Sequence, residues 1–364
     1  MSEETGLLYG LATGIGSMPH LNINSALQLI RENLPFGPHW PQLPQRGKAE
    51  TFVRQYLNPL IMLEMVETEK GETPFFYDYK DDWLEKMEKF YHLYLECCHN
   101  ADKGADISFF SFPRDTASGF YKFLDEQWGT LSGKPIFLKG QVSGPLTVGL
   151  QVNSGDQSAA FYRDDLRDII NKSIALNARF QVRLLKQHFS LPVVIFIDEP
   201  SLLAYGHSSY LSLSREQITG SIEEVIQAVK DEGALCGVHC CSGVDWSILF
   251  QLPLDVVSFD AYSYMDSMLV YPKEMNNFLD RGGCLGWGLV PTSDAIDYEN
   301  EFSLQERFWV GIRRLSRMGV NHDLLVKQFI LTPSCGVGTL SLSQSEKVYR
   351  TTFQLQKLLW DASN

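Results

Sequence analysis

The stretch Ala234-Leu235-Cys236-Gly237-Val238-His239-Cys240-Cys241-Ser242-Gly243 reads as a short apolar strand that ends in metal-binding residue types. Because side chains alternate between the two faces of a strand, His239 and Cys241 point to one side and Cys240 points to the other. Imidazole and thiolate are ligands that zinc prefers, and a catalytic zinc site uses three protein ligands and keeps a fourth position open. The stretch offers two of these three ligands. Taken alone, the pattern favours an alternative, in which the cysteines are small buried apolar residues.

Similar strands, each followed by polar residues, recur along the chain on both sides of this stretch. Pro192 to Ile197 is a continuous apolar run, which is typical of a parallel strand buried on both faces. From Lys134 onward, strand and helix patterns alternate at spacings that suit β-α units. The predicted strands centre near residues 10, 40, 138, 195, 237, 257, 287 and 331. We therefore predict an α/β fold of the (β/α)8 TIM-barrel type, with its active site at the C-terminal ends of the strands.

The length of the chain fits one large domain. We predict a single barrel domain over residues 1–364, with an α-rich insertion at about 58–133 between early strands. The insertion contains a helix near Leu60 to Val66 and a long helix from Asp82 to about Asn100. Its aromatic residues occur at mixed spacing, which favours packing in a core over a cofactor site.

The bulk composition excludes several kinds of partner. The net charge is −13 and the pI is near 5.1, so we expect no nucleic acid and no acidic membrane surface as partner. The N-terminus has no signal-peptide pattern, and no run approaches the ~18 apolar residues of a membrane span. The seven scattered cysteines favour reduced thiols over a disulfide framework. We predict a cytoplasmic protein.

Candidate site residues follow the predicted strands. His239 and Cys241 follow the fifth, Asp260 the sixth and Cys335 the eighth, while Asp198 follows the fourth. A barrel brings such strand ends together around one mouth, and two cysteines with one histidine form a catalytic zinc set. In the alternative, Cys241 and Cys335 are separate buried thiols and Asp260 is a helix cap. The remaining cysteines are predicted to be packing residues: Cys97, Cys98, Cys236, Cys240 and Cys284.

Five short motifs occur in order: Thr13-Gly14-Ile15-Gly16-Ser17-Met18-Pro19, Ser143-Gly144-Pro145-Leu146-Thr147, Ile197-Asp198-Glu199-Pro200-Ser201-Leu202, Val238-His239-Cys240-Cys241 and Pro333-Ser334-Cys335-Gly336. As an ordered set they resemble the C-terminal catalytic barrel of cobalamin-independent methionine synthase. The barrels of uroporphyrinogen decarboxylase and of corrinoid-dependent thiol methyltransferases share that fold. The His-x-Cys pair with a late Cys is similar to the methyltransferase branch.

The resemblance implies a Zn2+ ion held by His239, Cys241 and Cys335. Asp260 falls where the family has an acidic ligand, which is usually Glu. In the family the zinc binds the acceptor thiol of homocysteine and lowers its pKa, so that a thiolate attacks the methyl carbon. The resemblance names no catalytic residue beyond this zinc site.

The resemblance also implies a substrate-binding set. Asp198 matches the carboxylate that holds the substrate amino group, and Glu50 matches a second partner of that group. Gly16 and Ser17 match the backbone cradle for the substrate carboxylate. The resemblance therefore implies homocysteine or another small thiol as substrate.

The donor half of the family pattern is not kept. Gln151 stands where the family has a folate-stacking Trp, Ser293 where it has a proton-donor His, and Ala204 where it has an acidic residue. We therefore predict a methionine synthase-like S-methyltransferase whose donor is methylfolate or, in better agreement with these three positions, a methylcorrinoid protein. Two alternatives are a uroporphyrinogen decarboxylase-like enzyme, which would need an Arg cluster at the strand ends, and a non-catalytic zinc or thiol-binding protein.

Overall fold

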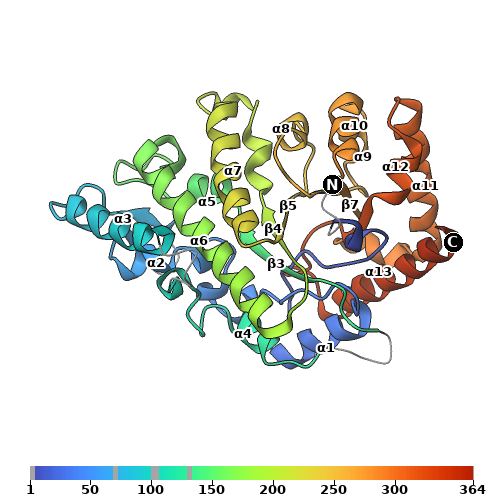
Figure 1. Cartoon of the computed structure of the whole chain (residues 1–364), viewed down its shortest axis with the longest axis horizontal. Helices are drawn as coiled ribbons and strands as arrows, with labels where there is room; N and C mark the ends of the chain where they lie inside the picture. Colours follow the sequence, from blue (N-terminus) through green and yellow to red (C-terminus); the bar gives the residue numbers. More distant parts are fainter. Residues whose placement is uncertain (1–4, 69–72, 100–105, 129–132, 364) are drawn as a thin grey trace.

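A curled, parallel six-stranded sheet forms the centre of the computed structural model, which describes residues 5–68, 73–99, 106–128 and 133–363 (Figure 1). The strands neighbour one another in chain order: β3 (Leu138–Ser143), β4 (Val193–Asp198), β5 (Leu235–Cys240), β6 (Val256–Phe259), β7 (Cys284–Val290) and β8 (Phe329–Pro333). Every residue of these strands is buried, as expected for a parallel sheet covered on both faces. Six of the eight predicted strands are thus confirmed.

The two earliest predicted strands are not formed. The first segment begins with a 3-10 helix, η1 (Thr5–Leu8), and then makes a single parallel bridge from Ala12 to Leu331. The second makes a single parallel bridge from His39 to Lys139. The second segment carries prolines at positions 38, 41 and 44. Since proline has no N–H to donate, a continuous ladder is not possible there.

Helices cover the outer face of the sheet, and most of them lie between successive strands (Figure 1). They are α1 (Ile23–Asn33), α2 (Asn58–Met62), α3 (Trp83–His99), α4 (Ser118–Leu124), α5 (Pro145–Gln151), α6 (Asp164–Phe189), α7 (Arg215–Asp231), α8 (Ser247–Phe250), α9 (Met265–Met268), α10 (Pro272–Asp280), α11 (Glu301–Arg317), α12 (His322–Lys327) and α13 (Leu342–Ser363). Ser214 caps α7, because its side chain accepts a hydrogen bond from the Gln217 amide. Within the described ranges, no helix combines the length and the apolar character needed to cross a membrane.

The two faces of the sheet belong to two separate apolar cores. The inner face contributes a small cluster that includes Val194, Phe196, Leu235, Val256, Cys284 and Ile330. The alternate residues of the same strands, such as Ile195, Val238 and Cys240, belong to the large core beneath the helices. This alternation decides which strand residues are available to a site inside the curled sheet.

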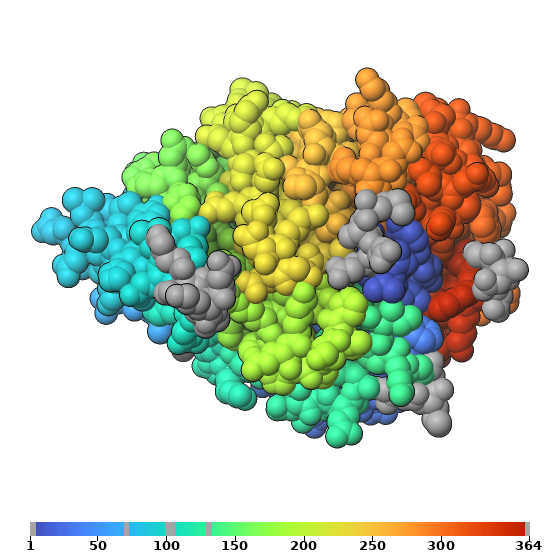
Figure 2. All heavy atoms as spheres, in the orientation of Figure 1, coloured from blue at the N-terminus to red at the C-terminus, as the bar shows by residue number. Residues whose placement is uncertain are grey.

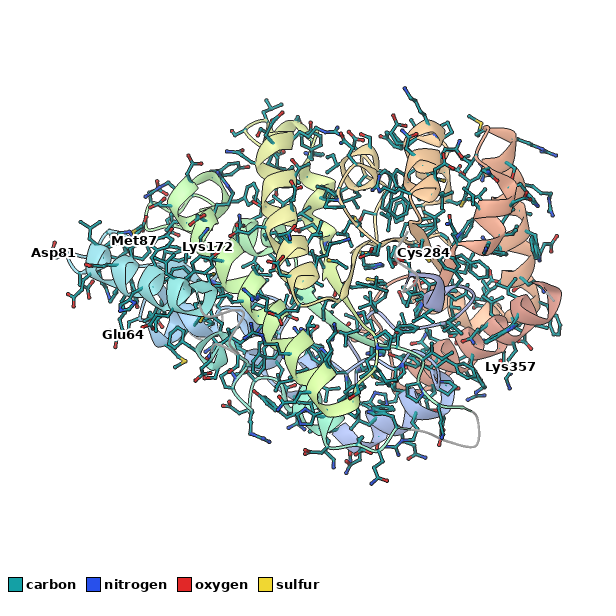
Figure 3. All side chains as sticks on the ribbon, in the orientation of Figure 1. Glu64, Asp81, Met87, Lys172, Cys284 and Lys357 are labelled. Atoms are coloured by element: carbon teal, nitrogen blue, oxygen red, sulfur yellow. The ribbon has the colours of Figure 1, made fainter. Side chains whose placement is uncertain are left out.

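The elements between α2 and α4 form one end of the molecule. They include a short antiparallel pair, β1 (Val66–Glu67) and β2 (Phe75–Phe76). In the space-filling view this part of the chain projects at one end of the long axis (Figure 2). Glu64, Asp81 and Met87 lie at that end, whereas Lys357 of α13 lies at the opposite end (Figure 3). Residues 69–72, 100–105 and 129–132 of the predicted insertion lie outside the described residues, and its status as an insertion stays a prediction.

Candidate metal centre

Three potential metal ligands from distant parts of the chain lie close together. One ligand atom from each of His239, Cys241 and Cys335 lies within 4.8 Å of the other two. His239 is on β5, Cys241 directly follows that strand, and Cys335 follows β8. The structure therefore brings together the three residues that the sequence offers as zinc ligands. Their binding of a metal stays a prediction.

The His239 imidazole has one free nitrogen. Its Nδ1 is 3.0 Å from the Ser258 hydroxyl oxygen, whereas its buried Nε2 has no hydrogen-bond partner among the described residues. A buried polar atom without a partner is unusual in a folded protein. A metal ion between Nε2 and the two thiols would satisfy it.

The two thiols affect each other's pKa. The pKa of Cys241 is lowered to about 4, mainly by a hydrogen bond from the Cys335 thiol, and the neighbouring His239 ring acts in the same direction. The pKa of Cys335 is raised, because its proton is held in that hydrogen bond and because the thiol is buried. One thiolate and one imidazole nitrogen are thus offered at the same point. This donor set fits zinc.

The sheet register places further site residues at the same height as His239. Across the sheet, Ser143 pairs with Asp198, Asp198 with His239, His239 with Ser258, and Ser258 with Gly286. Paired residues of neighbouring strands point to the same face of a sheet. We define these five residues as the site row.

Asp198 and Lys139 place opposite charges inside the curled sheet. Burial raises the pKa of Asp198 to about 6, while Lys139 and His239 act in the opposite direction. In the part of the chain that the structure describes, Asp198 Oδ1 has no hydrogen-bond partner. Burial also lowers the pKa of Lys139 to about 8. Lys139 Nζ donates to the Ile15 carbonyl and, at 3.1 Å, to Gln141 Oε1. The sequence reasoning missed Lys139, although a lysine inside an apolar strand was a usable signal.

The predicted carboxylate cradle lies against the Cys335 loop. Gly16 has a φ of 146°, a conformation that side chains strongly disfavour. The Ser17 carbonyl accepts a hydrogen bond of 2.9 Å from the Val337 amide, and a Cβ atom added to Gly336 would lie only 2.0 Å from Ser17 Oγ. The Gly16–Ser17 turn is therefore a neighbour of the candidate metal centre.

Asp260 is placed differently from the three ligands. It is not part of the metal-binding group found among the described residues. Its Oδ1 instead accepts a 2.8 Å hydrogen bond from the Ser263 amide, as in a turn cap. Burial raises the pKa of Asp260. Direct ligation by this carboxylate stays a prediction.

Glu50 is held by neighbours outside the site row. Its Oε1 accepts hydrogen bonds of 2.9 Å from Arg46 Nε and 2.8 Å from the Ser118 hydroxyl. Its buried Oε2 has no partner within the described ranges. The role of Glu50 toward a substrate ammonium group stays a prediction.

Comparisons with known proteins give distant structural similarities. No family model and no curated protein matches the chain. A B12-independent methionine synthase from Shewanella sp. W3-18-1, solved with selenomethionine, is 14% identical with a TM-score of 0.44; the match covers 62% of this chain and 63% of that one. A methyltransferase from Methanosarcina mazei is 11% identical with a TM-score of 0.43, over 94% of this chain and 93% of that one. Such low TM-scores carry no argument about function, which has to be built from the site residues.

Proposed function

We propose that this protein is a zinc-dependent S-methyltransferase of the methionine synthase type, which methylates homocysteine or another small thiol. The observation that carries the proposal is the convergence of the His239 imidazole, whose buried Nε2 has no hydrogen-bond partner by geometry among the described residues, with the thiols of Cys241 and Cys335. Three such ligands leave one position of a tetrahedral zinc open. Bound there, the ion would lower the pKa of an acceptor thiol, so that a thiolate is present at neutral pH.

The chain's own residues would bind and orient the acceptor. Asp198, with its free buried oxygen, would accept hydrogen bonds from the substrate ammonium group. Two backbone hydrogen bonds pair this segment with Gln42, and neither of them uses the Ser17 N–H. We therefore assign the Ser17 N–H to the substrate carboxylate. Lys139 adds a positive charge below the same turn, through its bond to the Ile15 carbonyl. In the transfer, a sulfur–methyl bond forms and the bond from methyl to donor breaks, with its electron pair left on the donor.

The proposal includes the closure of the sheet into a (β/α)8 barrel. Single parallel bridges join Ala12 to Leu331 of β8, Ser17 to Gln42, and His39 to Lys139 of β3. These bridges connect β8 at one edge of the sheet, through the two early segments, to β3 at the other edge, as a closed barrel requires. We also propose a cytoplasmic location, because a thiolate metal site requires reduced cysteines and the cysteines are free.

Metal analysis of matched cysteine variants tests the zinc site. We expect one zinc per chain in the wild type and in Cys240→Ala, and none in Cys335→Ser. Cys240 is a suitable control because it belongs to the same strand as His239 but packs in the outer core. Zinc retained at full stoichiometry and affinity by Cys335→Ser would refute the assigned ligand set.

Activity assays then test the reaction. The zinc-loaded protein would be incubated with homocysteine and either methylcobalamin or methylfolate, and methionine would be measured. We expect turnover with at least one donor, and methylcobalamin to be the better one, since Gln151, Ser293 and Ala204 replace the folate half of the family pattern. Zinc binding without turnover, for these donors and a panel of thiols, would favour the non-catalytic alternative.

A further inference from the structure

Ser258 contacts the one histidine of the metal-binding group from the neighbouring strand. Its hydroxyl oxygen is 3.0 Å from His239 Nδ1, and it is directly paired with His239 in the register of β5 and β6. Ser258 is fully buried. This contact orients the ring from the Nδ1 side, and the ring also interacts with Cys241.

The next strand leaves room for this contact. Gly286 of β7 is paired with Ser258, and a Cβ atom added to Gly286 would lie 2.6 Å from Ser258 Cβ and 2.9 Å from its Oγ. Real Cβ atoms do not approach other atoms so closely. A side chain at position 286 would therefore displace Ser258. Serine and glycine together fix the place of the hydroxyl next to His239.

The hydrogen bond has two possible directions, with opposite consequences for a metal. If the Ser258 hydroxyl donated to Nδ1, then Nε2 of a neutral His239 would carry a hydrogen and could not bind a metal. That hydrogen would lie beside the Cys241 thiolate and would occupy the nitrogen that a metal ion needs. If instead Nδ1–H donates to Ser258 Oγ, the Nε2 lone pair faces Cys241 and Cys335. Of the two arrangements of a neutral ring, the second is the one that leaves Nε2 able to bind a metal ion.

We infer that Ser258 is a positioning residue that holds His239 with its hydrogen on Nδ1 and its Nε2 lone pair directed at the two thiols. The inference rests on the proposed zinc site, and it adds a residue outside the ligand set. Partners of this kind fix the tautomer and the orientation of a metal-binding histidine, and their loss typically lowers metal affinity about 10- to 100-fold.

Zinc affinity of matched serine variants tests the inference. The dissociation constant would be measured by competition with a chromophoric chelator for the wild type, Ser258→Ala and Ser345→Ala. Ser345 is an equally buried serine on α13, whose hydroxyl bonds to the Leu342 carbonyl. We expect the affinity to fall at least about tenfold in Ser258→Ala and to stay within about twofold in Ser345→Ala. Equal affinities of the wild type and Ser258→Ala would overturn the inference while leaving the zinc site in place.

A second measurement on the wild type needs no variant. In the zinc-loaded protein with 15N-labelled histidine, the ring nitrogens of His239 show by NMR which of them carries a hydrogen. We expect Nδ1 to be protonated and Nε2 to be bound to the metal. The reverse assignment would overturn the role of Ser258, whereas a wild type that binds no zinc would remove the proposed function and this inference together.

Discussion

Replacing Asp198 by Asn should weaken substrate binding and at the same time stabilise the fold at alkaline pH. Asp198 is only 7% exposed, and burial raises its pKa from 3.8 to about 6. The folded state therefore binds the Asp198 proton more tightly than the unfolded state does between these two pH values. Since a pKa difference of one unit corresponds to about 1.4 kcal/mol, holding Asp198 ionised at pH 8 costs the fold about 3 kcal/mol. Asn has nearly the shape of Asp and carries no charge, so it avoids this cost.

Urea unfolding of the zinc-free protein at pH 4 and pH 8 measures the effect. Relative to the wild type, Asp198→Asn should gain up to about 3 kcal/mol in free energy of unfolding as the pH rises from 4 to 8, because the variant lacks the cost of ionising Asp198. Asp280→Asn, at an exposed position at the end of α10, is the control and should follow the wild type. If Asp198→Asn is less stable than the wild type at pH 8, the raised pKa of Asp198 and the argument from it are wrong.

The same variant separates function from stability. The lost bond between a carboxylate and an ammonium group, worth about 1.5–3 kcal/mol, should raise the KM for homocysteine roughly 10- to 150-fold. A thiol without an amino group should be affected much less. An equal change for both thiols would contradict the assignment of Asp198 to the ammonium group.

Three further predictions follow from buried groups elsewhere. A Cβ atom at Gly144 would lie 2.1 Å from Glu199 Oε2, so Gly144→Ala should lower the free energy of unfolding by about 1–3 kcal/mol in urea. The control is Gly220→Ala in α7, where an added Cβ atom meets no atom within 4 Å. That variant should leave stability unchanged or raise it by up to about 1 kcal/mol. Burial lowers the pKa of His39 to about 3, so between pH 6.5 and 3 the His39 side chain is protonated in the unfolded state and neutral in the folded state. Acidification over this range should therefore lower the free energy of unfolding, with a contribution from His39 of up to about 1.4 kcal/mol per pH unit. Urea unfolding of His39→Gln should lack this contribution. Free zinc at 100 times its Kd should stabilise the wild type by about 2.7 kcal/mol over the chelated protein, a difference that thermal unfolding should not find in Cys335→Ser.

Much of the sheet could be predicted from the sequence because its signal is local. The apolar run ending at Asp198 and the strand ending at Cys240 are buried on both faces, and a short apolar run bounded by turn residues is typical of a buried parallel strand. The segments near residues 10 and 40 were harder, because their single bridges depend on partners near Leu331 and Lys139 that local patterns do not reveal. Helix α5 is not among the predicted elements, because it begins at Pro145 inside one of the five short motifs and is only seven residues long.

The candidate metal ligands were found because cysteine and histidine carry a chemical signal of their own. Ser258 and Gly286 carry none, because serine and glycine are common and their roles arise only from pairing across β6 and β7. Lys139 is an intermediate case. A lysine is unusual in a buried strand and can be noticed in the sequence, but its contacts with Ile15 and Phe196 depend on other segments and cannot. Side chains that act through a neighbour are thus the part of a site that sequence patterns specify least.

The register of the sheet determines the geometry of the candidate metal centre. On β5, Val238 and Cys240 pack in the outer core, so His239 between them must face inward. A shift of β5 by one residue against β4 would bring Cys240 to the inner face and His239 among the helices. It would also bury an imidazole in an apolar core, at a cost of about 1–3 kcal/mol for an unpaired polar group. The apolar residues of the outer core therefore exclude the slipped register, and in doing so they direct the imidazole toward the thiols of Cys241 and Cys335.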